Sequence, residues 1–197
     1  MGDKKIYLIF TDTGTLFTKL IKLYTKKAMN HVSISFDDQL NEIFSFGRKK
    51  RYNPFIGGFV REKIAAGLFK KAKCEIYSIA ISESEYEQMQ VKVRQIEAKK
   101  DFYKYNLLGI FAIILNYNLK RENAYFCSQF VATILNEKKE LLCKSPSLCT
   151  PQDLMGIYGL QFIYKGDIIL FPLHANKEID SELTFSNYFM CNTVDFS

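Results

Sequence analysis

The stretch that decides the fold lies late in the chain and reads Tyr125-Phe126-Cys127-Ser128-Gln129-Phe130-Val131. Large apolar residues recur every fourth position, and their neighbours widen the same stripe, in the set Phe126, Phe130, Val131, Ile134 and Leu135. This spacing predicts an amphipathic helix whose apolar face packs on a core. We place the start of the helix near residues 123 to 125, which puts Cys127 in its first turn.

A cysteine in the first turn of a helix lies where the thiolate is favoured, because the unpaired N–H groups and the helix dipole stabilise negative charge. A neighbouring imidazole completes the activation by accepting the proton. The chain contains two histidines, His31 and His174. His31 begins a predicted strand, whereas His174 follows Pro172 in a stretch typical of a loop. His31 is therefore the candidate base for Cys127.

The segment around His31 alternates between polar and apolar residues from position 31 to 36, which predicts a strand with His31 on its polar face. Residues 37–39 have the composition of a tight turn, and residues 41–46 return as the second arm of a hairpin.

A histidine base needs an acceptor that orients its ring. Glu42 is the first choice on the second arm of the hairpin, since a carboxylate stabilises the imidazolium best. Strand parity is open by one residue at the turn, so Asn41 and Ser45 stay alternatives.

The remaining pattern predicts a single α+β domain over residues 1–197, with an antiparallel sheet packed against helices. Strands are expected at 6–11, 75–81 and 167–171. Helices are expected at 16–23, from the capping box of Ser82 and Glu85 to about residue 100, at 105–116, and after Thr150. Residues 47–67 contain Asn53-Pro54 and Gly57-Gly58 and are expected to form a long surface loop with some ordered structure, a candidate segment for contacting substrate.

Charge and cysteine content exclude several classes of function. The net charge of +6 comes partly from two basic runs, residues 48–51 and 70–73, which are typical of solvated loops or of attraction to an anionic partner such as lipid. Neither zinc-finger spacing nor an Arg-rich helix supports nucleic-acid binding. The five cysteines form no CxxC pair, so we expect free thiols and neither a metal nor a cofactor.

Membrane and export signals are weak in the sequence. The longest apolar run, residues 107–115, is too short to span a bilayer and predicts a buried helix. The first ten residues have too short an apolar stretch for a signal peptide. We therefore expect a soluble, cytoplasmic protein.

The segments Asn30-His31-Val32-Ser33-Ile34 and, much later, Phe126 to Val131 occur in an order that resembles the circularly permuted branch of the NlpC-type papain-like superfamily. That branch includes lecithin:retinol acyltransferase-like proteins and bacterial cysteine peptidases. In standard papain-like enzymes the cysteine precedes the histidine, and the permuted branch reverses this order. The resemblance covers about residues 5 to 171 and matches the (Tyr/Phe)-Cys-Ser-(Glu/Gln)-(Phe/Leu)-(Val/Ile) segment residue by residue.

The resemblance implies that Cys127 is the nucleophile, that His31 is the base, and that a polar third residue follows on the next strand, which again selects Glu42 or a close neighbour. Tyr125 and Ser128 are further candidates for contacts to the oxyanion or the substrate, and a core aromatic is an equally good interpretation of Tyr125. The expected function is hydrolysis of a peptide or acyl-amide bond through a thioacyl-enzyme. The alternatives are acyl transfer or lipid amide or ester hydrolysis with the same dyad, where residues 107–115 would wall an acyl pocket, and an inactive binding module.

Overall fold

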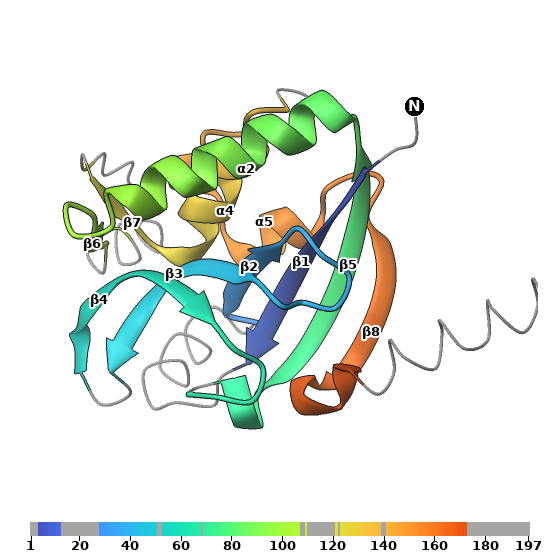
Figure 1. Ribbon diagram of the computed structural model, residues 1–197, viewed down its shortest axis with the longest axis horizontal. Helices are drawn as coiled ribbons and strands as arrows, with labels where there is room; N and C mark the ends of the chain where they lie inside the picture. The colour runs from blue at the N-terminus through green and yellow to red at the C-terminus, as the bar shows by residue number, and fades with distance from the viewer. Residues whose placement is uncertain are drawn as a thin grey trace, which may run out of the picture.

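The computed structural model describes residues 4–12, 28–50, 53–67, 69–106, 109, 121, 123–138 and 141–172. Within these residues, a six-stranded antiparallel sheet is combined with a few helices, which confirms the expected α+β class (Figure 1). The strand order is β4-β3-β2-β1-β5-β8. The strands are β1 (Lys4–Asp12), β2 (His31–Ser35), β3 (Ile43–Lys50), β4 (Asn53–Glu62), β5 (Lys73–Ile81) and β8 (Gln161–Asp167).

The central strand β1 shows how the sequence builds two cores. Ile6, Leu8 and Phe10 lie on one face of the sheet, while Ile9 lies on the other, because successive side chains of a strand alternate. Pairing of Phe10 with Val32 and of Leu8 with Ile34 carries the first face across to β2. Both faces of the sheet are therefore buried.

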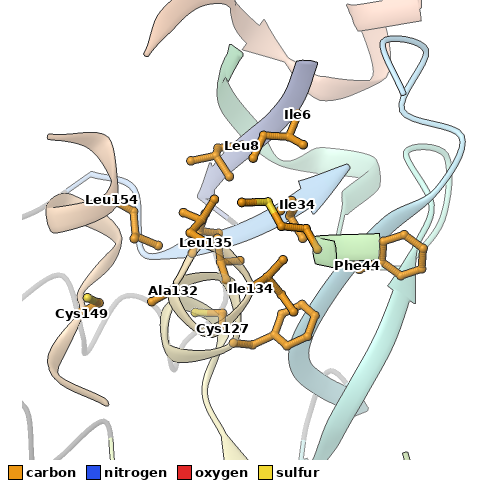
Figure 2. Packing of buried hydrophobic residues seen from close by; sticks show 14 of the residues in the cluster. Ile6, Leu8, Ile34, Phe44, Cys127, Ala132, Ile134, Leu135, Cys149 and Leu154 are labelled. Atoms are coloured by element: carbon orange, nitrogen blue, oxygen red, sulfur yellow. The ribbon is translucent and has the colours of Figure 1, made fainter. Parts of the chain in front are cut away.

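Two helices cover the larger core. The helix α2 (Glu83–Ala98) begins at the predicted capping box, in which Ser82 and Glu85 satisfy each other's backbone N–H groups. The helix α4 (Cys127–Leu135) packs Ala132, Ile134 and Leu135 among residues of β1 and β2 (Figure 2). The short helix α5 (Pro151–Met155) follows its predicted cap, Thr150.

The opposite face of the sheet is covered by two 3₁₀ turns, η1 (Phe69–Lys71) and η3 (Ile168–Leu170). A strand was expected at residues 167–171, and this prediction is wrong. Ile168 and Phe171 are buried, whereas Ile169 and Leu170 are 40% and 50% exposed. Burial three residues apart fits a turn of 3₁₀ helix and not the alternation of a strand.

The expected surface loop at 47–67 is also a wrong prediction, because most of it forms the ends of β3 and the edge strand β4. Pro54 is compatible with β4 because an edge strand tolerates a missing donor. Gly57 is required by close packing: a Cβ at this position would lie 2.7 Å from the Gly47 carbonyl oxygen and 2.8 Å from Tyr105 Cβ. These residues, which favour a loop by composition, are used here for edge pairing and close approach.

Tyr105, expected to begin a helix, instead ends β6 (Lys104–Tyr105), which pairs in parallel with β7 (Ala124–Tyr125). The remainder of the helix predicted at 105–116, apart from the helical Gly109, lies outside the described residues, as does the helix predicted at 16–23.

Candidate active site

The nucleophile candidate Cys127 is the first residue of α4, and its side chain faces the sheet. The N-cap residue, Phe126, is extended and makes no side-chain cap bond, so the first N–H groups of the helix are not used by a cap. The Ser128 N–H donates to the Cys127 sulfur. The residue is only 7% exposed. Cys127 is therefore a buried thiol at a helix N-terminus, as predicted, although the helix begins two to four residues later than the predicted start near residues 123 to 125.

A second backbone donor reaches Cys127 from β2. The ladder between β2 and β3 joins Ile34 to Phe44 and Ser35 to Ile43. At the next step towards His31, the Ser45 hydroxyl donates to the Val32 carbonyl over 2.9 Å. The N–H and C=O of one strand residue point to the same side, so the Val32 N–H also faces the gap towards β3, where it donates to the Cys127 sulfur.

His31 connects this thiol to a carboxylate. Its Nε2–H donates to Glu62 Oε1 over 2.8 Å, and the other Glu62 oxygen accepts from the Ser33 hydroxyl. Both side chains of the His31–Glu62 pair are 13% exposed. Because Nε2 faces Glu62, Nδ1 is the ring nitrogen that remains for the hydrogen bond between His31 and Cys127. The three side chains form the chain Cys127–His31–Glu62.

The electrostatics of this chain favour a thiolate beside an imidazolium. Burial lowers the pKa of His31, but the charges of Glu62 and Cys127 and the hydrogen bonds to both raise it to about 10. Burial raises the pKa of Cys127, yet the His31 charge and hydrogen bond, followed by the Val32 and Ser128 N–H groups, bring that pKa below its ordinary value. The compensation of burial by a paired charge is the usual physical basis of a reactive thiol.

The predicted orienting residue, Glu42, does not lie at His31. Glu42 is exposed and accepts a hydrogen bond from Arg61 Nη1 over 2.6 Å, so the prediction that Glu42 lies beside the His31 ring is wrong. Asn41 is also exposed, and its amide binds Asp37. Ser45, the third alternative, lies near the ring, with its hydroxyl 3.5 Å from His31 Nε2. Sequence reasoning missed Glu62 because residues 47–67 were interpreted as a loop, which hid the strand that carries it.

The side chains of Tyr125 and Ser128 have structural partners. The Tyr125 ring stacks on Tyr103 at 5.4 Å between centroids and meets Phe46 edge-on, so its contacts are those of an aromatic core. The Ser128 hydroxyl is buried and donates to the Cys149 carbonyl over 2.8 Å, which ties α4 to the segment before α5. Only the backbone N–H of Ser128 faces the thiol.

Tyr105 lies near Cys127 and was not singled out from the sequence as a site residue. Tyr105 pairs with Tyr125, two positions before the nucleophile, and its pKa is raised by burial and by the charge of Cys127. The charge of Arg48, which is half-buried near the end of β3, acts on the same hydroxyl and lowers its pKa. The local sequence carries no signal for this role, because Tyr105 reaches the site through the pairing of β6 with β7.

Other expectations can be placed only in part. His174 and the apolar run 107–115, except Gly109, lie outside the described residues. In the described part of the chain, no group of three or more His, Cys, Asp or Glu side chains could hold a metal ion. No helix in that part is both long and apolar enough to cross a membrane.

Comparison of the chain with protein-family models, with curated proteins and with solved structures gave no significant match. The chemistry of the site therefore has to be argued from its own geometry.

Proposed function

We propose that this chain is a cysteine hydrolase that cleaves an amide bond through a thioacyl-enzyme. The observation that carries the proposal is the hydrogen-bonded chain from Cys127 through His31 to Glu62, with the thiol pKa lowered and the imidazole pKa raised. A merely structural cysteine needs none of these partners, since buried thiols are ordinarily inert and neutral. The order of a histidine strand before a cysteine helix also supports a circularly permuted papain-like domain.

In the proposed reaction, the Cys127 thiolate attacks the carbonyl carbon and forms the C–S bond, and the carbonyl oxygen becomes an oxyanion. The candidate donors to that oxyanion are the Ser128 N–H, which donates to the Cys127 sulfur, and the Tyr105 hydroxyl, whose pKa the Cys127 charge raises. The His31 imidazolium then protonates the leaving nitrogen as the C–N bond breaks.

The second half of the reaction releases the acyl group. Neutral His31 takes a proton from water as the water oxygen attacks the thioester carbonyl, the C–S bond breaks, and the carboxylic acid leaves with the thiolate restored. Glu62 holds the ring in the orientation that presents Nδ1 to sulfur, and it stabilises the imidazolium of the resting ion pair, which forms again in the second half-reaction.

The test uses p-nitrophenyl acetate, an activated ester that requires no specific recognition. We expect a burst of p-nitrophenol, an acetyl group on Cys127 by mass spectrometry, and slow turnover of that adduct. Cys127→Ser should remove burst and adduct, and Cys149→Ser provides a matched buried control that should retain both. If no adduct forms on Cys127 under conditions in which free thiols are acylated, the site is that of a binding module.

Acyl transfer is distinguished in the same experiment by adding an amine or alcohol acceptor and ester donors with long acyl chains. Transfer that outpaces hydrolysis by more than tenfold would assign the dyad to an acyltransferase. Hydrolysis that is indifferent to the acceptor would keep the assignment as a hydrolase.

A further inference from the structure

The Glu62 side chain reaches His31 across β3, at a place where β3 carries small residues. Glu62 pairs with Ile43 of β3, and Ser45 and Gly47 follow Ile43 on the same face because the side chains of a strand alternate. A Cβ on Gly47 would lie 3.6 Å from His31 Cε1 and 3.9 Å from Glu62 Oε1. The carboxylate and the imidazole therefore meet over Gly47, one strand inward from the edge strand that carries Glu62.

Ser33 of β2 binds the Glu62 carboxylate from the opposite side of β3. Ser33 is fully buried, and its hydroxyl donates to Glu62 Oε2, while the His31 Nε2–H donates to Glu62 Oε1 over 2.8 Å. Holding a long side chain in one conformation costs rotamer freedom. Hydrogen bonds to a charged acceptor are strong enough to offset this cost. Both oxygens of Glu62 are thus held where the carboxylate faces the imidazole.

The hydroxyl hydrogens nearest to His31 Nε2 are given to other acceptors. Ser33 Oγ lies 3.4 Å and Ser45 Oγ 3.5 Å from Nε2. A serine hydroxyl has one hydrogen. Ser33 gives its hydrogen to Glu62, and Ser45 gives its hydrogen to the Val32 carbonyl over 2.9 Å. Towards Nε2 the two hydroxyls and the carboxylate can therefore only accept, which keeps a hydrogen on Nε2 in the neutral as well as the protonated ring.

The groups that face His31 come from three elements. Burial lowers the pKa of His31, whereas Glu62 from β4 and Cys127 from α4 raise it to about 10. Phe69 from η1 meets the ring edge-on at 6.3 Å between centroids and carries no charge. The imidazolium thus depends on the place of the Glu62 carboxylate, and whatever holds that carboxylate acts on the thiol as well.

We propose that Ser33 is a positioning residue of the active site. Its hydroxyl holds the Glu62 carboxylate on His31 and, together with Ser45, keeps a hydrogen on Nε2, so that the proton exchanged with Cys127 is the one on Nδ1. This inference rests on the proposed function and adds to it a residue that acts on Cys127 through Glu62 and His31. Neutral His31 then presents the lone pair of Nδ1, which is what a general base requires in the second half-reaction.

The test measures the rate at which iodoacetamide labels Cys127 of the full-length protein as a function of pH. In Ser33→Ala we expect the rate at pH 6.5 to fall about fivefold, the effect of losing one hydrogen bond to a charged group. The upper limb of the profile, where His31 loses its proton, should move to lower pH. The effect should be smaller than that of Glu62→Gln, because the carboxylate stays in the site but leaves His31 for part of the time.

Ser35→Ala is the matched control, because Ser35 is as buried as Ser33, lies on the same face of β2 and donates to Asp37. Both variants should lose similar stability in urea, yet Ser35→Ala should keep the wild-type pH profile. A double variant identifies the route of the effect. In the Glu62→Gln background, Ser33→Ala should change the rate less than twofold, because a positioning residue acts only through the group that it positions.

The hydrogen on Nε2 is tested in the wild type by nitrogen-15 NMR of histidine-labelled protein. The chain has two histidines, so His174→Gln assigns the signals of His31. We expect the Nε2 signal to remain that of a nitrogen with a bound hydrogen throughout the titration, while the Nδ1 signal moves. Loss of the hydrogen from Nε2 would overturn the inference without any variant of Ser33.

The labelling outcomes separate this inference from the proposed function. A Ser33→Ala profile that equals the wild type, or that Ser35→Ala reproduces, would overturn the role of Ser33 and leave the hydrolase intact. A fivefold loss in the Glu62→Gln background would overturn it too, because Ser33 would then act independently of Glu62. Labelling of wild-type Cys127 as slow as that of Cys149 would overturn the proposed function itself. If Ser33→Ala does not fold, Ser33→Cys, which fills nearly the same space with a weaker donor, takes its place in the same comparison.

Discussion

Cys127 and Cys74 are both buried thiols on the same sheet-based scaffold, yet their surroundings act in opposite directions. Cys74 lies in β5 on the smaller core, where burial raises its pKa to about 12 despite a backbone hydrogen bond from Gly166, and nearby Asp167 and Glu75 raise it further. Cys127, at the junction of α4 with β2, has a lowered pKa because His31 and two backbone N–H groups compensate its burial.

The comparison shows that burial alone raises the pKa of a thiol and keeps it unreactive. A reactive thiol also needs a neighbouring positive charge and hydrogen-bond donors. Cys149 supports the same lesson from a third place, since burial raises its pKa to about 11 although Lys144 lies close enough to lower it. A distant or solvated cation is therefore insufficient, whereas a hydrogen-bonded imidazolium held by Glu62 reverses the effect.

The largest expected effect is the contrast in reactivity among the three buried thiols. Burial raises the pKa values of Cys74 and Cys149 and suppresses their thiolates, whereas the lowered pKa of Cys127 favours its thiolate. Allowing for the lower intrinsic nucleophilicity of an acidic thiol, we expect iodoacetamide to label Cys127 about 1,000-fold faster. Peptide mapping after timed alkylation measures the rates, and equal rates at Cys127 and Cys149 would break the comparison.

His31→Ala should make Cys127 resemble Cys74, a buried thiol whose pKa is raised. In the wild type we expect the labelling rate to rise with pH, with a midpoint below the ordinary thiol pKa of about 8.5. The ion pair of Cys127 and His31 should then persist until His31 loses its proton near pH 10. Without the imidazolium, burial is uncompensated, so the transition should move above about 8.5 and the rate at pH 6.5 should fall about 100-fold. Stopped-time labelling from pH 4 to 10 measures both profiles.

Gly57→Ala should disturb the site through packing and not through charge. Its Cβ would lie 2.7 Å from the Gly47 carbonyl oxygen, which is backbone and cannot move away easily. We expect a loss of about 1–3 kcal/mol in the free energy of unfolding, as overpacking usually costs. Gly58→Ala is the matched control, because its Cβ would approach no atom closer than 3.3 Å. Urea denaturation compares the two, and equal midpoints would contradict the packing argument.

The sequence was sufficient for the elements with a strong local signal. The capping box at Ser82, the cap at Thr150 and the apolar stripe of α4 predicted those helices, because caps and periodicity are encoded within a few residues. The sequence also nominated His31 and Cys127 by chemistry, since a thiol at a helix start needs an imidazole. The structure brings these two residues together across about a hundred positions of the chain.

What the sequence could not supply was the identity of the side chain on the far side of the imidazole. Glu62 reaches His31 from β4, and β4 was hidden because its Pro54 and Gly57-Gly58 are loop-like in composition. Pro54 is tolerated because β4 is an edge strand, and Gly57 is needed because Tyr105 packs against it. Both reasons lie in the tertiary structure and cannot be recognised from the local sequence. The search for an acceptor was thus confined to the second arm of the hairpin, where Glu42 is the only carboxylate.

Glu62→Gln should weaken the pair without removing its hydrogen-bond geometry. The amide oxygen still accepts from His31, but the loss of charge lowers the pKa of His31 below about 10 and, through the ion pair, raises that of Cys127. A change of about one pKa unit corresponds to roughly tenfold in labelling rate at pH 6.5. The upper limb of the pH profile should move to lower pH, and an unmoved limb would contradict the orienting role of Glu62.

Glu42→Gln should have the smallest effect, and it sharpens the comparison because it removes the same charge one strand away from Glu62. Glu42 is exposed and bound to Arg61, which also holds Glu97. An exposed ion pair contributes about 1 kcal/mol or less, since solvent screens it and long side chains lose freedom in forming it. We therefore expect labelling of Cys127 within twofold of the wild type and the same pH profile. A profile shifted as far as that of Glu62→Gln would mean that net charge, and not the contact at His31, tunes the thiol.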